Sequence, residues 1–126
     1  FNDYLGAYKE LEEEYEKGRI KNIGISNFED GKFEEIYNAV KIKPVLNQIE
    51  LHPYFQQKNI RERMEKVYMK TEGWGPLAEA KTDLFNEEVI NKAATKYKKT
   101  PAQIILRWHI QSGFITKKIS KYLILN

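Results

Sequence analysis

Short apolar segments of the kind that form buried β-strands alternate along this chain with segments whose apolar residues recur at helical spacing. The strand-like segments cover residues 19–25, 45–51, 69–74 and 114–116. Because a regular alternation of strands and helices is typical of a parallel sheet, the pattern predicts the α/β class. The helical stripes are marked by Tyr8 and Leu11, by Phe33 and Ile36, by Ile60 and Met64, by Ala93 and Tyr97, and by Ile104 and Trp108.

Local signals mark where several of these helices begin and end. Asp3 is placed to cap the first helix, and Gly18 is placed to end it. The clearest signal is the segment 100–103, in which Thr100 precedes a proline and Gln103 follows three residues after the threonine. That combination predicts a capping box at the start of the last helix.

The composition limits the classes of function. The 126 residues, 41% of them hydrophobic, suffice for one core and argue against intrinsic disorder. No apolar run approaches the roughly 20 residues of a transmembrane helix, so no membrane partner is expected. The absence of cysteine excludes a disulfide framework, and His52 and His109 lack partners at ligand spacing, so no metal site is predicted.

The net charge of +3 comes wholly from Lys117, Lys118 and Lys121 near the end of the sequence. Because these lysines are clustered in one short segment, the charge favours a solvated terminus over a nucleic-acid-binding face.

Polar side chains stand where the predicted strands end, which is where parallel α/β proteins place functional residues. Ser26 and Asn27 follow the first strand, where the local pattern favours a cap for the next helix; the alternative is that they hydrogen-bond a planar carboxamide. Gln48 shares a strand face with Glu50, so this pair is predicted to face a cavity or a hydrogen-bond network. Trp74, before a Gly-Pro turn, is either a ring for stacking on a base or cofactor, or a core side chain.

The two histidines give weaker signals. His52 is a general base by residue type, or else a loop histidine whose ring bonds the backbone. His109 follows Trp108 on a helix and is predicted to be structural. No Gly-rich phosphate loop and no Ser/His/Asp set can be assembled from the sequence.

Four segments resemble, in order and spacing, motifs of the aldo-keto reductase family. They are Gly-Arg-Ile-Lys-Asn-Ile-Gly-Ile-Ser-Asn-Phe at 18–28, Asn-Gln-Ile-Glu-Leu-His-Pro-Tyr at 47–54, Glu-Gly-Trp-Gly-Pro-Leu at 72–77, and Thr-Pro-Ala-Gln with Leu-Arg-Trp-His between 100 and 109. The family folds as a (β/α)8 TIM barrel and reduces aldehydes and ketones to alcohols with a nicotinamide cofactor, usually NADPH. The resemblance implies that residues 1–126 are the C-terminal half of one such barrel domain and cover strands five to eight.

The resemblance also implies a set of cofactor-binding residues, which are Ser26, Asn27, Gln48, Trp74, Gly75, Pro76 and Leu77. The first three would hold the nicotinamide carboxamide, which reverses the local preference for a helix cap. The tryptophan would stack on the nicotinamide ring, and the last three residues would lie along the pyrophosphate. NADPH is the expected cofactor, and NADH stays open because Lys117 and Lys118 match the family's segment after strand eight only loosely.

The family's catalytic Asp, Tyr, Lys and His lie before strand five. The resemblance therefore implies no catalytic residue in this chain, which by itself is expected to be inactive. Its parent is expected to be a cytoplasmic monomer that acts on a small-molecule aldehyde or ketone, and the segment 117–126 is interpreted as an aberrant tail. The alternative is a non-catalytic half-barrel, either a remnant or an interaction module that pairs through exposed strand edges.

Overall fold

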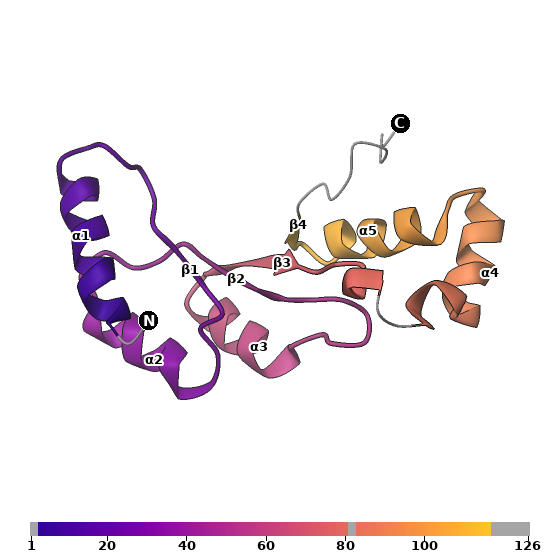
Figure 1. Ribbon diagram of the computed structural model, residues 1–126, viewed down its shortest axis with the longest axis horizontal. Helices are drawn as coiled ribbons and strands as arrows, with labels where there is room; N and C mark the ends of the chain where they lie inside the picture. Colours follow the sequence, from indigo (N-terminus) through magenta and orange to yellow (C-terminus); the bar gives the residue numbers. More distant parts are fainter. Residues whose placement is uncertain (1–2, 81–82, 117–126) are drawn as a thin grey trace.

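A four-stranded parallel sheet forms the centre of the computed structural model, which describes residues 3–80 and 83–116 (Figure 1). Its strands lie side by side in chain order and are β1 (Gly24–Ser26), β2 (Leu46–Glu50), β3 (Lys70–Trp74) and β4 (Ile115–Thr116). Parallel strands in sequential order are the arrangement that a β/α barrel requires, and the predicted α/β class is confirmed. The tail predicted over residues 117–126 lies outside the described residues.

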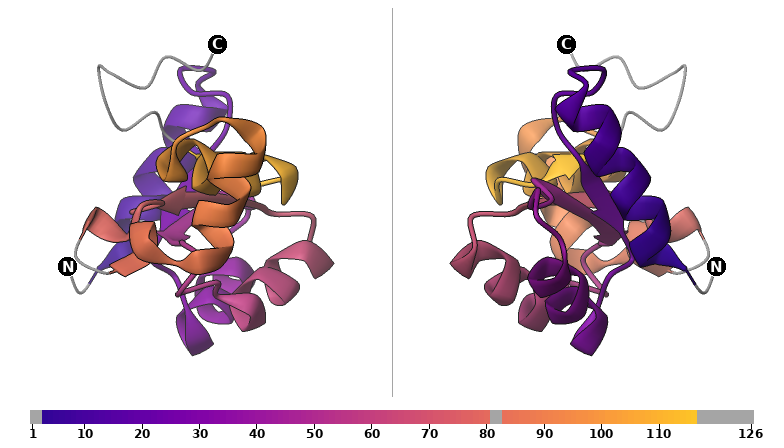
Figure 2. Two further views of the ribbon diagram at one scale, coloured as in Figure 1. Left: turned by 90° about the vertical axis from the view of Figure 1, so that its right-hand side faces the viewer. Right: turned by 90° about the vertical axis from the view of Figure 1, so that its left-hand side faces the viewer.

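Helices connect successive strands, as the alternating pattern predicts. They are α1 (Tyr4–Glu16) before β1, α2 (Asp30–Ala39) between β1 and β2, α3 (Lys58–Lys66) between β2 and β3, and α4 (Glu88–Tyr97) and α5 (Pro101–Gln111) between β3 and β4. Two short 3-10 segments, Ala78–Ala80 and Asp83–Asn86, precede α4. Figures 1 and 2 show α1 toward one end of the sheet, and α4 with α5 toward the other. In the same views α2 and α3 lie side by side, and Arg63 joins them through its ion pair with Glu34 at 2.9 Å.

The first strand is shorter than predicted. Only Gly24–Ser26 is strand, whereas the apolar pattern predicted residues 19–25. The backbone amide of Arg19 donates to the carbonyl of Glu14 at 3.0 Å, and that of Ile20 points to the same carbonyl at 3.4 Å. These amides complete the last turn of α1 and are therefore unavailable to a sheet.

The predicted helix caps are present. Oδ1 of Asp3 accepts a hydrogen bond from the amide of Gly6 at 2.7 Å, at the first turn of α1. At the start of α5 the amide of Gln103 donates to Oγ1 of Thr100 at 3.2 Å, and the amide of Thr100 donates to Oε1 of Gln103 at 2.9 Å. This reciprocal pair is the capping box that the sequence predicted.

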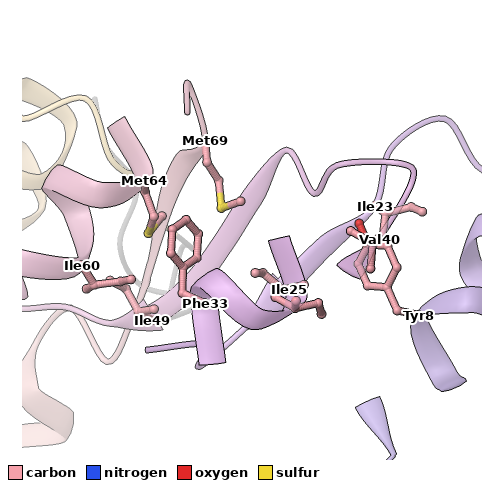
Figure 3. Packing of buried hydrophobic residues seen from close by; sticks show 10 residues of the cluster. Tyr8, Ile23, Ile25, Phe33, Val40, Ile49, Ile60, Met64 and Met69 are labelled. Carbon is pink, nitrogen blue, oxygen red and sulfur yellow. The ribbon is translucent and has the colours of Figure 1, made fainter. Parts of the chain in front are cut away.

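The larger hydrophobic core lies between one face of the sheet and α1, α2 and α3 (Figure 3). A smaller cluster is formed by Ala78 and Leu84 from the two 3-10 segments and by Ile105 from α5. Burial alternates along β2 and β3, so one face of each strand packs on helices while the other is partly exposed. The buried members of the larger core are Tyr8, Ile23, Ile25, Phe33, Ile36, Val40, Ile49, Ile60, Met64 and Met69.

The other face of the sheet carries most of the polar side chains of the strands. Because the strands are parallel and in register, Ser26 lies beside Gln48, and Gln48 lies beside Glu72. Glu50 and Trp74 form the next pair toward the carboxyl ends. The predicted shared face of Gln48 and Glu50 is thus present, and it continues onto both neighbouring strands.

Candidate functional site

The candidate site begins where β1 and β2 end. Ser26 closes β1, and its hydroxyl donates a hydrogen bond to the backbone carbonyl of Gln48 at 3.0 Å. The backbone amide of Asn27 donates to the same carbonyl at 2.9 Å. These two bonds hold the end of β1 against β2, and they leave the Ser26 and Asn27 side chains exposed on the polar side of the strands.

Trp74 reaches across β2 to meet this pair. Its indole N–H donates to Oδ1 of Asn27 at 2.7 Å, which links β3 to β1 although these strands are not neighbours. Asn27 has a positive φ of 59°, a conformation that asparagine adopts more readily than most residues. The left-handed turn and the indole bond together fix the Asn27 amide at the carboxyl edge of the sheet.

Gln48 carries the second candidate amide, after that of Asn27. Its Nε2 donates to Oε1 of Glu72 at 2.6 Å, so the amide plane is held by a carboxylate on the adjacent strand. Among the residues that the structure describes, Oε1 of Gln48 and Nδ2 of Asn27 accept or donate no further hydrogen bond. One acceptor and one donor are therefore available for a planar amide ligand beside the indole ring.

The residues after Trp74 form a tight turn. Gly75 has a φ of 60°, where a side chain would be strained, and its carbonyl accepts from the amide of Ala78 at 2.8 Å. Pro76 is fully buried, and Leu77 packs against the cluster of Ala78, Leu84 and Ile105. The side chains of Pro76 and Leu77 thus face the core, and a ligand along this turn would meet backbone atoms.

Two of the alternatives weighed from the sequence are wrong. Ser26 and Asn27 do not cap α2, because its N-cap residue is Glu29. The ring of His52 is not satisfied by backbone. Its Nε2 lies 3.3 Å from Oε1 of Glu50, and its buried Nδ1 has no hydrogen-bond partner in the described chain.

Sequence reasoning missed several polar contacts around the site. Asn47 is 0% exposed, and its amide donates to the carbonyl of Phe28 at 2.7 Å, which anchors the segment after Asn27. Glu72, which orients Gln48, is not a candidate residue by its sequence pattern and appears only within the segment 72–77. The strand register would have paired Glu72 with Gln48, but register is not visible in a single strand's pattern.

A further contact ties the loop after β2 to the start of α4. The phenol of Tyr54 donates to the carboxylate of Glu87, and this carboxylate raises the pKa of Tyr54 to about 12. The bond spans 33 residues of sequence, so no local pattern could have indicated it. It fixes the loop after β2 to the segment that follows the turn at residues 75–77.

Neither a metal site nor a membrane-spanning helix occurs in the described part of the chain. No group of three or more His, Asp or Glu residues there is arranged to hold a metal ion. No helix in the ranges 3–80 and 83–116 is long and apolar enough to cross a membrane.

Comparison with known sequences gives consistent matches. The sequence profile of the Aldo/keto reductase family matches residues 2–121. Methylglyoxal reductase DkgA of Escherichia coli (strain K12) is 40% identical over 112 residues, which are 89% of this chain and 41% of that protein. Glyoxal reductase of Bacillus subtilis (strain 168) is 37% identical over 124 residues, which are 97% of this chain and 44% of that protein. This chain therefore spans less than half the length of these relatives.

Comparison with solved structures agrees. The crystal structure of a mutant of Gox0644 in complex with NADPH matches with a TM-score of 0.82 and 46% identity, over 88% of this chain and 40% of that chain. The aldo/keto reductase from Brucella melitensis matches with a TM-score of 0.80 and 41% identity, over 90% of this chain and 43% of that one. The expected barrel type is confirmed, with this chain corresponding to part of it.

Proposed function

Because the chain belongs to the aldo/keto reductase family, we propose that it forms the nicotinamide-binding part of an enzyme that reduces aldehydes and ketones with NADPH. The observation that carries the proposal is the bonded cluster of Ser26, Asn27, Gln48 and Trp74 at the carboxyl edge of the sheet. Three elements distant in sequence converge there, and each contributes a residue that the family resemblance assigned to the cofactor.

The chemistry of the cluster fits a nicotinamide. A carboxamide needs an acceptor for its N–H2 group and a donor for its carbonyl, and Oε1 of Gln48 and Nδ2 of Asn27 are of those types. The half-buried indole of Trp74 supplies a flat apolar surface for a ring. When bound, the nicotinamide supplies the hydride that reduces the carbonyl carbon.

The residues of this chain would orient the ring and leave proton transfer to others. Holding the carboxamide would fix which face of the ring meets the substrate, and the indole would shield the ring from water. The proton donor and its supporting residues are expected in the part of the barrel before strand five. Residues 1–126 alone would then be a cofactor-binding half without turnover.

The substrate is proposed as a small aldehyde or ketone, in line with the glyoxal and methylglyoxal reductases among its relatives. Binding of NADH in place of NADPH stays open. The monomeric state and cytoplasmic location of the parent enzyme stay predictions.

Cofactor binding by residues 1–126 tests the proposal directly. We expect NADPH fluorescence to titrate saturably with the chain, and Asn27→Ala to weaken binding about tenfold because one hydrogen bond to the carboxamide is lost. Asn22→Ala is the matched control, since Asn22 is exposed before β1 and away from the cluster. No saturable binding by the wild-type chain, or equal losses in both variants, would contradict the proposal.

The second candidate is a non-catalytic half-barrel that pairs through its strand edges. The observation that favours it is that β1 and β4 each have one strand neighbour within the described residues, so each presents an unpaired edge. This candidate predicts association of the chain without any effect of NADPH.

A further inference from the structure

His109 is buried directly behind the turn at residues 74–77. It lies on the last turn of α5 and is 0% exposed. The rings of Trp108 and Phe114 enclose it edge-on, with centroids 4.9 Å and 6.0 Å from its own. Aromatic rings on two sides leave the imidazole little freedom to rotate.

The imidazole packs against the backbone of β3 just before Trp74. A Cβ placed on Gly73 would lie 3.3 Å from both Cε1 and Nδ1 of His109, and 3.2 Å from Cβ of Leu51. Such distances are tighter than most carbon contacts, so a side chain at position 73 would push the His109 ring or Leu51 aside by a few tenths of an ångström. The ring of His109 thus packs against the backbone at the end of β3.

The His109 ring also lies near the backbone carbonyl of Pro76, in the turn that follows Trp74. Burial is the main cause that lowers the pKa of His109 to about 4; the backbone carbonyl of Pro76 partly opposes it by favouring the protonated form, and His52 lowers the pKa further. The ring is therefore neutral near pH 7. Neither of its nitrogens completes a hydrogen bond to a described residue.

Two buried nitrogens without a complete hydrogen bond to a described residue are unfavourable, and an apolar side chain of similar volume would avoid that cost. A buried polar group kept at such a cost calls for an explanation other than packing. Its two contacts, at Gly73 and Pro76, flank Trp74 on both sides along the chain.

We propose that His109 is a positioning residue that sets the backbone on both sides of Trp74 and so keeps the indole on Asn27. The position of the indole is a property of the chain itself, and its importance for cofactor binding rests on the proposed function. The proposal predicts opposite effects on stability and on the site when the imidazole is removed.

The experiment measures solvent exchange of the Trp74 indole N–H by NMR in the free chain. The chain has two tryptophans, so Trp108→Phe assigns the two indole signals. In His109→Leu we expect exchange of the Trp74 indole at least about tenfold faster, because its bond to Asn27 is loosened, while the Tm stays equal or rises. His109→Gln, which keeps an N–H toward Pro76, is expected to exchange within about threefold of wild type. Ile104→Val, on the same helix but lining the groove toward α4, is the control and leaves the signal unchanged.

The outcomes are separable from those of the proposed function. A folded His109→Leu protein with wild-type Trp74 exchange overturns the proposal, and so does a His109→Leu protein that unfolds or melts lower. NADPH titration of the same variants forms a second arm, in which His109→Leu binds about tenfold more weakly and His109→Gln nearly as well as wild type. If the wild-type chain binds no NADPH, the proposed function fails, and the indole exchange still decides the role of His109.

Discussion

At the scale of single residues, polar side chains decide how the carboxyl edge of the sheet is organised. Asn47 holds the segment after β1 through the carbonyl of Phe28, and Glu72 holds the amide of Gln48. Both bonds are partly buried, so losing either partner would leave an unpaired polar atom shielded from water. Asn47 and Glu72 therefore position the candidate site without being candidate ligand-binding residues themselves.

His109 makes stability depend on pH. Its folded-state pKa of about 4 lies below the 6.5 of an unperturbed histidine, so the unfolded chain binds more protons between these values. Stability is then complete above about pH 6.5 and falls as the pH drops toward about 4. The other titratable group facing the ring is His52, from the loop after β2.

Urea unfolding of wild type and His109→Leu at several pH values measures this dependence. Between pH 6.5 and 5 we expect the wild type to lose about 1.5 kcal/mol more than the variant, because the unfolded histidine is half protonated at pH 6.5 and the slope approaches about 1.4 kcal/mol per pH unit below it. The carboxylates titrate in both proteins and cancel in the difference. Parallel pH curves for the two proteins would show that His109 is not held neutral by its burial.

At the scale of elements, the helix ends follow local chemistry closely. The capping box at Thr100 and the cap at Asp3 were predicted and are present. The strand boundaries followed less closely, since Arg19 and Ile20 have strand-like neighbours but bond back to α1. A cap is decided by residues three positions apart, whereas a strand end depends on what its amides meet in space.

The Thr100 cap provides a prediction at this scale. Thr100→Ala removes the acceptor for the Gln103 amide and is expected to lower the free energy of unfolding by about 1 kcal/mol. Thr100→Ser keeps a hydroxyl in place and serves as the matched control, with a smaller loss. Chemical denaturation monitored by far-UV circular dichroism measures both, and equal stability of Thr100→Ala and wild type would rule out a contribution from the cap.

At the scale of the whole molecule, one face of the sheet packs on helices and the other carries Ser26, Gln48, Glu72 and Trp74 partly exposed. The strands at both sides of the described sheet, β1 and β4, have an unpaired edge. Parallel strands with free edges are templates for pairing with another chain. This property follows from the order of the strands and from none of the local patterns.

We therefore expect the weight-average mass of the chain to rise with concentration in sedimentation experiments. Ile115→Lys places a charge on the β4 edge, where Ile115 is 44% exposed, and is expected to suppress association. Val89→Lys, at a 77% exposed position on α4, adds the same charge on a different element and is expected to leave association intact. A monodisperse monomer at all concentrations would argue against edge pairing.

The sequence by itself determined the alternation of elements, the helix caps, the family resemblance and the candidate residues Ser26, Asn27, Gln48 and Trp74. All of these depend on residues close together in the chain, where spacing and propensity are decisive. Only the tertiary structure decided three contacts. The Trp74 indole donates a hydrogen bond to Asn27, Glu72 accepts one from the Gln48 amide, and the His109 ring packs against Gly73. These contacts join residues more than 20 positions apart, and they depend on strand register and helix packing, which no local pattern encodes.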